Sequence, residues 1–220
     1  KDLKKQLDSH FGALAEHYKP DTSVPDVDLP AQAKSIAVPF DIPQTMVRFG
    51  AQGLKRSDPD YLNAYVMNQI IGGSTLNSRL GMEIREKRGL AYSVASRLNP
   101  MIHAASWDGM FSTRSEQAAN AKDILLAALK DFSDNGITDI EFSDAREYLM
   151  GAFVLNLDSN ADIANFLITM QIHKLGLDYL DRRNTLIAAV SKEDVEEASR
   201  RILDTGKLVV VTLGKTEDKK

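Results

Sequence analysis

Four histidines could take part in metal-dependent chemistry: His10, His17, His103 and His173. A hydrolytic metal site needs two or three His, Asp or Glu ligands at helical spacing around an open coordination position. The histidines form neither a His-x-x-Glu-His pattern nor its inverse. His10 and His17 lie seven residues apart, but no Glu stands between them in the required register. The sequence therefore predicts no metal site in this chain, and surface or structural roles are favoured for all four.

Motifs for nucleophilic or phosphate chemistry are also missing from the sequence. The absence of cysteine excludes disulfides, thiolate metal sites and a cysteine nucleophile. There is no Gly-x-Ser-x-Gly elbow, and the turn Gly72-Gly73-Ser74 lacks the Lys that reaches a phosphate in a Walker-type loop. A turn between two helices is the favoured interpretation of this segment.

The same segment begins a longer pattern. Residues 72–80 are Gly-Gly-Ser-Thr-Leu-Asn-Ser-Arg-Leu, and residues 83–94 are Glu-Ile-Arg-Glu-Lys-Arg-Gly-Leu-Ala-Tyr-Ser-Val. This pattern closely resembles the signature of the second, non-zinc-binding half-domain of the insulinase, pitrilysin and mitochondrial-processing-peptidase family of zinc metallopeptidases. The shared features are a glycine-rich turn, Ser-Arg-Leu and then Arg-Glu-x-Arg-Gly-Leu-x-Tyr. Ser74 stands where a third glycine is common. This difference affects the expected conformation of the loop more than the expected fold.

The resemblance implies that two similar half-domains enclose a chamber. The first half bears a zinc site of His-x-x-Glu-His plus a downstream Glu, and the second contributes an arginine and a tyrosine whose spacing is matched here by Arg85 and Tyr92. It further implies that zinc is held by the partner and not by this chain. The expected partner is a zinc-bearing N-terminal half-domain or a catalytic subunit, and the expected substrate is a peptide.

The chemistry of such a pair follows from its side chains. Arg85 is expected in the last turn of a helix and Tyr92 just inside the next strand, with a corner at Gly89 that could bring them to one site. Both donate hydrogen bonds, which suits a carbonyl that is becoming an oxyanion. They cannot generate the nucleophile, so this chain alone should not hydrolyse peptides. In the alternative interpretation, Arg85 pairs with Glu86 and Tyr92 only packs in the sheet.

The elements around this pair are predicted from apolar spacing. Leu76, Leu80 and Ile84 predict a helix that ends near Gly89, followed by a strand over residues 90–98 in which Tyr92 shares a face with Leu90 and Val94. Alternation over residues 103–113 predicts the second strand of a hairpin, with Trp107 as a core anchor.

Further strands are expected over residues 35–40, 44–50 and 207–213. Pro39 and Pro43 favour an edge position for the first two. Because family members bind peptide as an added strand along a sheet edge, residues 45–53 are a candidate for substrate contact through Thr45, Val47 and Phe49. A plain edge strand is the alternative.

Most of the remaining chain has helical spacing and caps. Helices are expected over residues 58–71 and 116–133, after Thr138 and Ser159, over residues 179–189, and after Ser191. Strands at both ends with a hairpin between helix pairs do not give regular βαβ alternation. They predict an α+β fold, a two-layer sandwich in which helices cover a mixed or antiparallel sheet.

The N-terminal part differs from the rest. Leu3, Leu7, Phe11 and Leu14 predict a helix of about 15 residues, and prolines recur among acids beyond it. We expect residues 1–18 to be the last helix of a preceding half-domain, 19–33 a linker, 34–215 the substrate-binding domain and 216–220 a tail. The chain would then be cut from a longer polypeptide.

Charge and hydropathy exclude several classes of protein. Lys and Arg number 27 against 31 Asp and Glu, so no positive surplus favours nucleic acid or an anionic membrane. No apolar run approaches the roughly 20 residues that cross a bilayer. A soluble protein of the bacterial periplasm or cytoplasm is expected, although the sequence does not fix the compartment.

Three functions remain open from the sequence. The chain could be the half-peptidase that supplies Arg85 and Tyr92, a structural member of the same family that has lost hydrolysis, or a module that only binds peptides. The sequence upstream of Lys1 would separate the first two, and a peptide titration with and without zinc would test the third.

Overall fold

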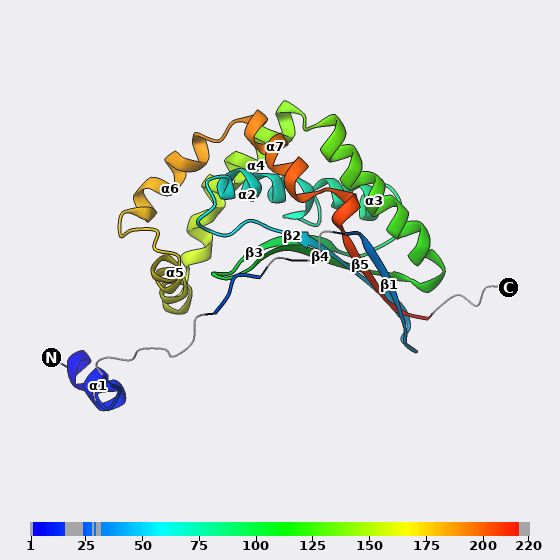
Figure 1. The fold of residues 1–220 in the computed structure, drawn as a ribbon. Helices are drawn as coiled ribbons and strands as arrows, with labels where there is room; N and C mark the ends of the chain where they lie inside the picture. The colour runs from blue at the N-terminus through cyan, green and yellow to red at the C-terminus, as the bar shows by residue number, and fades with distance from the viewer. Residues whose placement is uncertain (1, 16–23, 28, 30–31, 216–220) are drawn as a thin grey trace.

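The computed structural model describes residues 2–15, 24–27, 29 and 32–215. In the main body, a sheet forms one layer and helices form the other (Figure 1). The sheet order is β1-β5-β2-β4-β3, with β1 and β5 parallel and the other neighbours antiparallel. This arrangement confirms the predicted α+β sandwich with a mixed sheet. The strands are β1 (Lys34–Pro39), β2 (Gln44–Gln52), β3 (Val94–Pro100), β4 (Ala105–Arg114) and β5 (Val209–Gly214).

The helical layer contains most of the expected helices. The α-helices after the first are α2 (Tyr61–Gly72), α3 (Ala118–Asn135), α4 (Asp139–Gly151), α5 (Asn160–Ile172), α6 (Tyr179–Ala188) and α7 (Lys192–Ile202). Shorter helical segments are η1 (Gly81–Glu86), η2 (Ser115–Gln117), η3 (Ala152–Leu157) and η4 (Thr205–Lys207). Thr138 and Ser191 form the capping boxes that begin α4 and α7, so local sequence decides these two boundaries.

The expected edge position of β2 is wrong. β2 pairs with β5 on one side and β4 on the other, and only β1 of the two proline-flanked strands lies at an edge. Pro39 is the last residue of β1, and Pro43 precedes β2. Because neither proline removes a donor from within β2, both of its ladders can form.

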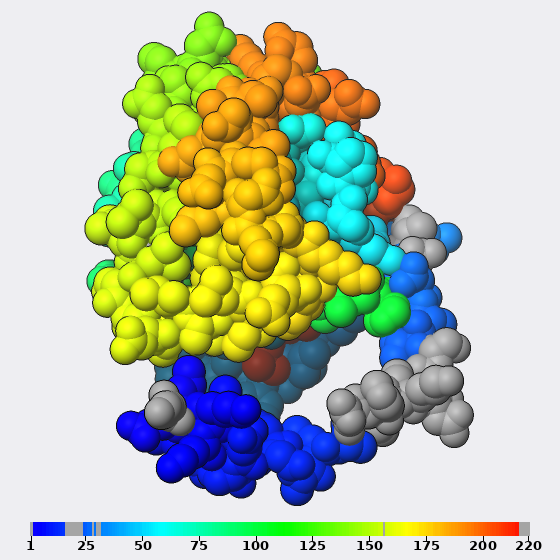
Figure 2. Space-filling model, turned by 90° about the vertical axis from the view of Figure 1, so that its left-hand side faces the viewer, coloured from blue at the N-terminus to red at the C-terminus, as the bar shows by residue number. Residues whose placement is uncertain are grey.

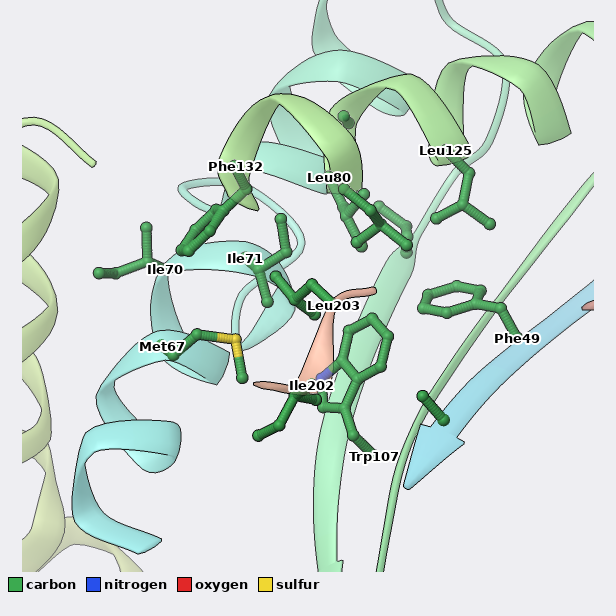
Figure 3. Packing of buried hydrophobic residues seen from close by; sticks show 14 of the residues in the cluster. Phe49, Met67, Ile70, Ile71, Leu80, Trp107, Leu125, Phe132, Ile202 and Leu203 are labelled. Carbon is green, nitrogen blue, oxygen red and sulfur yellow. The ribbon is translucent and has the colours of Figure 1, made fainter. Parts of the chain in front are cut away.

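The core lies between the sheet and the helices (Figure 3). Trp107 of β4 is fully buried, and its ring centroid lies 5.4 Å from that of Phe49 in β2. Ile202, the last residue of α7, and Leu203, which follows it, pack into the same cluster. The alternation predicted for β4 is confirmed, because the side that carries Trp107 is buried throughout.

A small polar network crosses this core. The Trp107 indole Nε1 and the Ser96 hydroxyl each donate to Asn68 Oδ1 at 2.9 Å, and Asn68 Nδ2 donates to the Ser96 carbonyl at 3.3 Å. All three residues are buried. The network joins α2 to β3 and β4 by satisfying polar groups that would otherwise be stranded away from water.

The N-terminal helix α1 (Asp2–Phe11) is shorter than expected, and none of its residues is buried. Leu3, Leu7 and Phe11 are all exposed, so its apolar face has no partner within the described residues. Much of the predicted linker and the whole predicted tail lie outside the described residues. The division into a preceding half-domain, linker and main domain therefore stays a prediction. None of the described helices combines the length and apolar character of a membrane span.

Candidate functional site

The segment with the family-like pattern forms a compact turn around η1. Ser74 Oγ accepts hydrogen bonds from the backbone amides of Leu76 and Asn77 at 3.3 and 3.4 Å, so the serine in place of a third glycine stabilises the turn. The predicted helix through Leu76 is shorter than expected, because Leu76 lies in this turn and is 54% exposed. Its other two apolar positions, Leu80 and Ile84, are buried and hold η1 against the core.

The short helix η1 has π geometry and is closely packed at its start. A Cβ added to Gly81 would lie 2.1 Å from the Thr75 carbonyl oxygen, so only glycine fits there. A π turn widens the helix by one residue and is frequent at functional sites. Here it carries Arg85, whose side chain is 29% exposed.

Gly89 forms the expected corner. Its φ of +60° is left-handed, and its amide donates to the Arg85 carbonyl at 2.8 Å while the Leu90 amide donates to the Ile84 carbonyl at 2.9 Å. These two bonds end the helical turn and fix the direction in which the chain leaves it.

Tyr92 lies beyond this corner but not inside a strand. β3 begins at Val94, so the predicted strand starts four residues too early. The predicted shared face is also wrong, because Tyr92 is 88% exposed whereas Leu90 and Val94 are buried. Buried residues on both sides therefore hold the backbone while the phenol points into solvent.

The Arg85 guanidinium bonds the carboxylate of its neighbour Glu86. The alternative pairing considered from the sequence is thus present. Within the described residues, no hydrogen bond joins Arg85 to Tyr92. Both side chains are accessible from outside, and the corner at Gly89 lies between them.

Arg79 is the residue of this segment that sequence reasoning missed. Its Nε lies 2.5 Å from Glu141 Oε1, and its Nη2 donates to Glu141 Oε2 at 2.9 Å and to the Gly136 carbonyl at 2.7 Å. Its guanidinium carbon also lies 4.7 Å from the centre of the Phe132 ring. The Thr138-x-x-Glu141 pattern predicted that Glu141 caps a helix. No sequence pattern near Glu141 indicated that it also binds an arginine 62 residues away.

This ion pair changes the protonation of both partners. Hydrogen bonding to Glu141 raises the pKa of Arg79 against the opposing effect of burial. Burial acts to raise the pKa of Glu141, but hydrogen bonds from Arg79 and Thr138 outweigh it and lower that pKa to about 2. Glu141 is therefore a carboxylate at any pH near neutral.

A cavity of about 510 Å³ lies beside this pair, between η1 and α3. Its charged groups are neutralised within the chain, because Lys87 and Arg88 both bond Glu83, as Arg79 bonds Glu141. Neither Arg85 nor Tyr92 is among its lining residues.

The three side chains suggested for substrate contact on β2 are buried. Thr45, Val47 and Phe49 are 3%, 0% and 2% exposed. β4 pairs with β2 over its whole length and β5 pairs with it over residues 46–50, so the central part of β2 has no free edge for an added peptide strand. Within the described sheet, the unpaired edges belong to β1 and β3.

The histidines do not assemble a site. His103 Nδ1 lies 3.2 Å from Asp26 Oδ1, and that carboxylate also bonds Lys55. His10 is exposed, and His17 lies outside the described residues. In the part of the chain that the structure covers, no three His, Cys, Asp or Glu side chains could share a metal ion. The described side chains therefore do not fit a zinc site of their own.

Comparison with known proteins decides the family. Residues 1–149 match the family model described as the peptidase M16 inactive domain. The chain belongs to this family. The match confirms the resemblance inferred from the glycine-rich turn and the segment around Arg85 and Tyr92, and it makes the chain a member of a family of zinc protease-like proteins.

Individual relatives agree with this assignment. An uncharacterized zinc protease of Streptomyces coelicolor is 31% identical over 163 residues, which cover 73% of this chain and 35% of that protein. The non-peptidase homolog YmxG of Helicobacter pylori is 31% identical over 160 residues, which cover 71% of this chain and 36% of that protein. The chain thus spans about a third of the length of these curated relatives.

Solved structures share the M16 inactive-domain fold. The peptidase M16 inactive domain from Pseudomonas fluorescens is 30% identical, with a TM-score of 0.85 over all of this chain and 52% of that one. A protease from Helicobacter pylori is 16% identical with a TM-score of 0.82, which shows likeness of fold alone.

Proposed function

We propose that this chain is the C-terminal, substrate-binding half of a zinc metalloendopeptidase. In this proposal Arg85 and Tyr92 act on the peptide bond at a zinc site carried by an N-terminal half-domain or a catalytic subunit. The observation that supports it most is the presentation of Tyr92. Tyr92 is 88% exposed, although Leu90 and Val94 on either side are buried. Packing of these two residues fixes the backbone, and the Tyr92 hydroxyl can donate a hydrogen bond to a group outside this chain.

The chemistry of the two side chains is electrostatic. When bound in the partner, zinc would supply an activated water. The Tyr92 hydroxyl would donate to the substrate carbonyl oxygen, and the Arg85 guanidinium would stabilise the negative charge that develops there. Glu86 does not prevent this role, because an accessible ion pair contributes only about 0–1 kcal/mol and can be exchanged for a stronger anion.

The exposed face of α1 fits the same arrangement. Leu3, Leu7 and Phe11 form an apolar stripe that nothing in the described chain covers. Residues 1–18 would belong to the preceding half-domain, and residues 19–33 would connect it to the substrate-binding domain at 34–215. In the complete protein this stripe would pack within that first half.

A second function is a non-hydrolytic member of the same family. It is favoured by one relative, the Helicobacter pylori protein described as a non-peptidase homolog, which is 31% identical to this chain. The two functions differ in the partner. An intact His-x-x-Glu-His motif in the upstream half or in a neighbouring subunit supports hydrolysis, and a degenerate motif supports the structural role.

The test uses the complete protein with its zinc-bearing half and a fluorogenic peptide. Tyr92→Phe and Arg85→Ala should each lower kcat by about 10²–10³-fold, the cost of one lost oxyanion donor. Tyr148→Phe and Arg200→Ala are matched controls, because both residues are exposed on the helical layer. Full activity in both Tyr92→Phe and Arg85→Ala would overturn the proposed roles.

A further inference from the structure

A second cavity, of about 240 Å³, lies between α2, α5 and α6. These helices lie together on the face of the molecule that Figure 2 shows. Aromatic rings form much of its wall: the ring of Phe166 lies 5.2 Å from that of Phe153 at an edge-to-face angle and 6.4 Å from that of Tyr179. Such a wall offers a flat apolar surface to a planar group.

Two arginines line this aromatic cavity. The Arg56 guanidinium lies 4.2 Å from the centre of the Tyr61 ring and 5.3 Å from that of Tyr179, and it donates to the Tyr179 hydroxyl. Contacts with two rings and a hydroxyl hold the group in place. They do not neutralise its charge.

Arg183 is buried more deeply, with 5% of the residue exposed. Its guanidinium lies 4.0 Å from the Phe153 ring centre and donates at 3.0 Å to the Leu149 carbonyl and to Asn184 Oδ1. A buried cation without an acid is costly, and these neutral partners offset the cost only in part.

No carboxylate lines the cavity within the described chain. Among the acids close in sequence, Asp58 and Asp60 both bond Arg201 and Asp178 bonds Arg182. Asp181, two residues before Arg183, is not among the residues that line the cavity. Arg56 and Arg183 form no ion pair among the described residues. This distinguishes the cavity from the larger one beside Arg79, whose charges are paired internally.

Two neighbouring groups add no negative charge to the cavity. Burial raises the pKa of Tyr61 to about 12, so its phenol stays a hydrogen-bond donor. Burial, and secondarily the charge of Arg56, lower the pKa of His173, so this imidazole is held toward its neutral form and the positive charge of the site comes from the two arginines. A donor-rich, acid-free site of this kind selects a negatively charged ligand.

We infer that this cavity binds a small organic anion that joins a carboxylate to a planar apolar group. The carboxylate bonds Arg56 and Arg183, and the planar group lies against Phe153 and Phe166. Arginine suits this role because its planar fork matches the two carboxylate oxygens. The carboxylate could belong to a free aromatic acid or to the C-terminus of a peptide that ends in an aromatic residue.

The inference does not depend on hydrolysis and is tested on this chain alone by isothermal titration calorimetry. The probes are 3-phenylpropionate, its neutral amide, and a tetrapeptide that ends in Phe with a free or an amidated C-terminus. At least one acid should bind about ten-fold or more tightly than its amide, since a hydrogen bond to a charged group is lost in the amide. Binding of the free acid identifies a small-molecule ligand, and binding of the peptide acid alone identifies a peptide C-terminus. Equal affinity of acids and amides, or no binding of either acid, would overturn the inference.

A variant locates the site. Arg56→Gln should weaken binding of the acid about ten-fold or more. Arg114→Gln, which removes the same charge from an exposed position on β4, should leave it unchanged. Unchanged affinity in a folded Arg56→Gln protein would contradict the assignment. If that variant does not fold, the comparison of acid with amide on the unaltered chain still decides.

Discussion

Arg79 and Glu141 form a bidentate ion pair that joins the residues just before η1 to the first turn of α4. The distances are 2.5 Å between Nε and Oε1 and 2.9 Å between Nη2 and Oε2. Glu141 is at the same time the third residue of α4 and forms the capping box with Thr138. One carboxylate therefore both begins a helix and anchors the turn that precedes Arg85.

Loss of this anchor should destabilise the domain. The Arg79 and Glu141 side chains are 17% and 27% exposed, so Arg79→Ala leaves a largely buried carboxylate and an unpaired Gly136 carbonyl. We expect a loss of about 2–3 kcal/mol in the free energy of unfolding, measured in urea. Arg88→Ala, which removes a more exposed partner of Glu83, should cost less than about 1 kcal/mol. Equal losses would contradict the anchoring role.

The same pair predicts a dependence of stability on pH. Because the pKa of Glu141 falls from 4.5 to about 2 on folding, the folded protein binds this proton more weakly than the unfolded chain. Its contribution is fully present above pH 4.5 and is lost as pH falls through 2. Wild type should exceed Glu141→Gln in unfolding free energy by on the order of 3 kcal/mol at neutral pH, and the gap should close in acid. Glu147→Gln, an exposed change on the same helix, is the control; a gap of constant size would contradict the prediction.

The buried amide of Asn68 should also be essential to stability. Asn68→Leu removes the acceptor of both the Trp107 indole and the Ser96 hydroxyl. Two buried donors would lose their partner, and a cost of about 2–4 kcal/mol follows. Thermal unfolding measures it, with Asn63→Leu on the same helix as the partly exposed control. A small effect at position 68 would mean that water replaces the amide.

Two glycines with open space around them should respond to alanine in opposite directions. No atom lies within 4 Å of a Cβ added at Gly89 or Gly151. Gly89 has φ +60°, so Gly89→Ala should cost about 1–2 kcal/mol through backbone strain alone. Gly151 has helical φ −80°, so Gly151→Ala should stabilise by about 0.5–1 kcal/mol. Denaturant unfolding of both variants gives the two signs.

Tyr92→Phe should separate activity from stability. Because the phenol is 88% exposed and forms no hydrogen bond within the described residues, its removal should change the free energy of unfolding by less than about 0.5 kcal/mol. Under the proposed function, a loss of peptide hydrolysis in the complete protein then reports on the hydroxyl itself. A lowered melting temperature of similar size to that of Asn68→Leu would instead show a structural role.

Local signals predicted the helical layer well. The Thr138 and Ser191 boxes begin α4 and α7 as expected, and the alternation around Trp107 gives the buried side of β4. Each of these features depends on contacts within a few residues or on one strand's own period. The glycine corner predicted at Gly89 is likewise present, with φ +60°.

Features that depend on distant parts of the chain were missed. The place of β2 in the sheet is set by pairing with β5, far along the sequence, and the prolines flanking it gave the opposite indication. Alternation around Tyr92 resembled a strand, but the turn at Gly89 delays regular pairing until Val94. Arg79 finds its partners on α3 and α4, which no local spacing could indicate.

The parallel pairing of β1 with β5 has a consequence for biosynthesis. Lys34 pairs with Val209 and Pro39 with Gly214, so nearly the whole domain must leave the ribosome before this ladder can close. Until then one long side of β2 has no neighbour and is open to pairing with other chains. The nascent chain is thus exposed to such pairing until β5 emerges, and a chaperone that shields this open side of β2 would protect it at that stage.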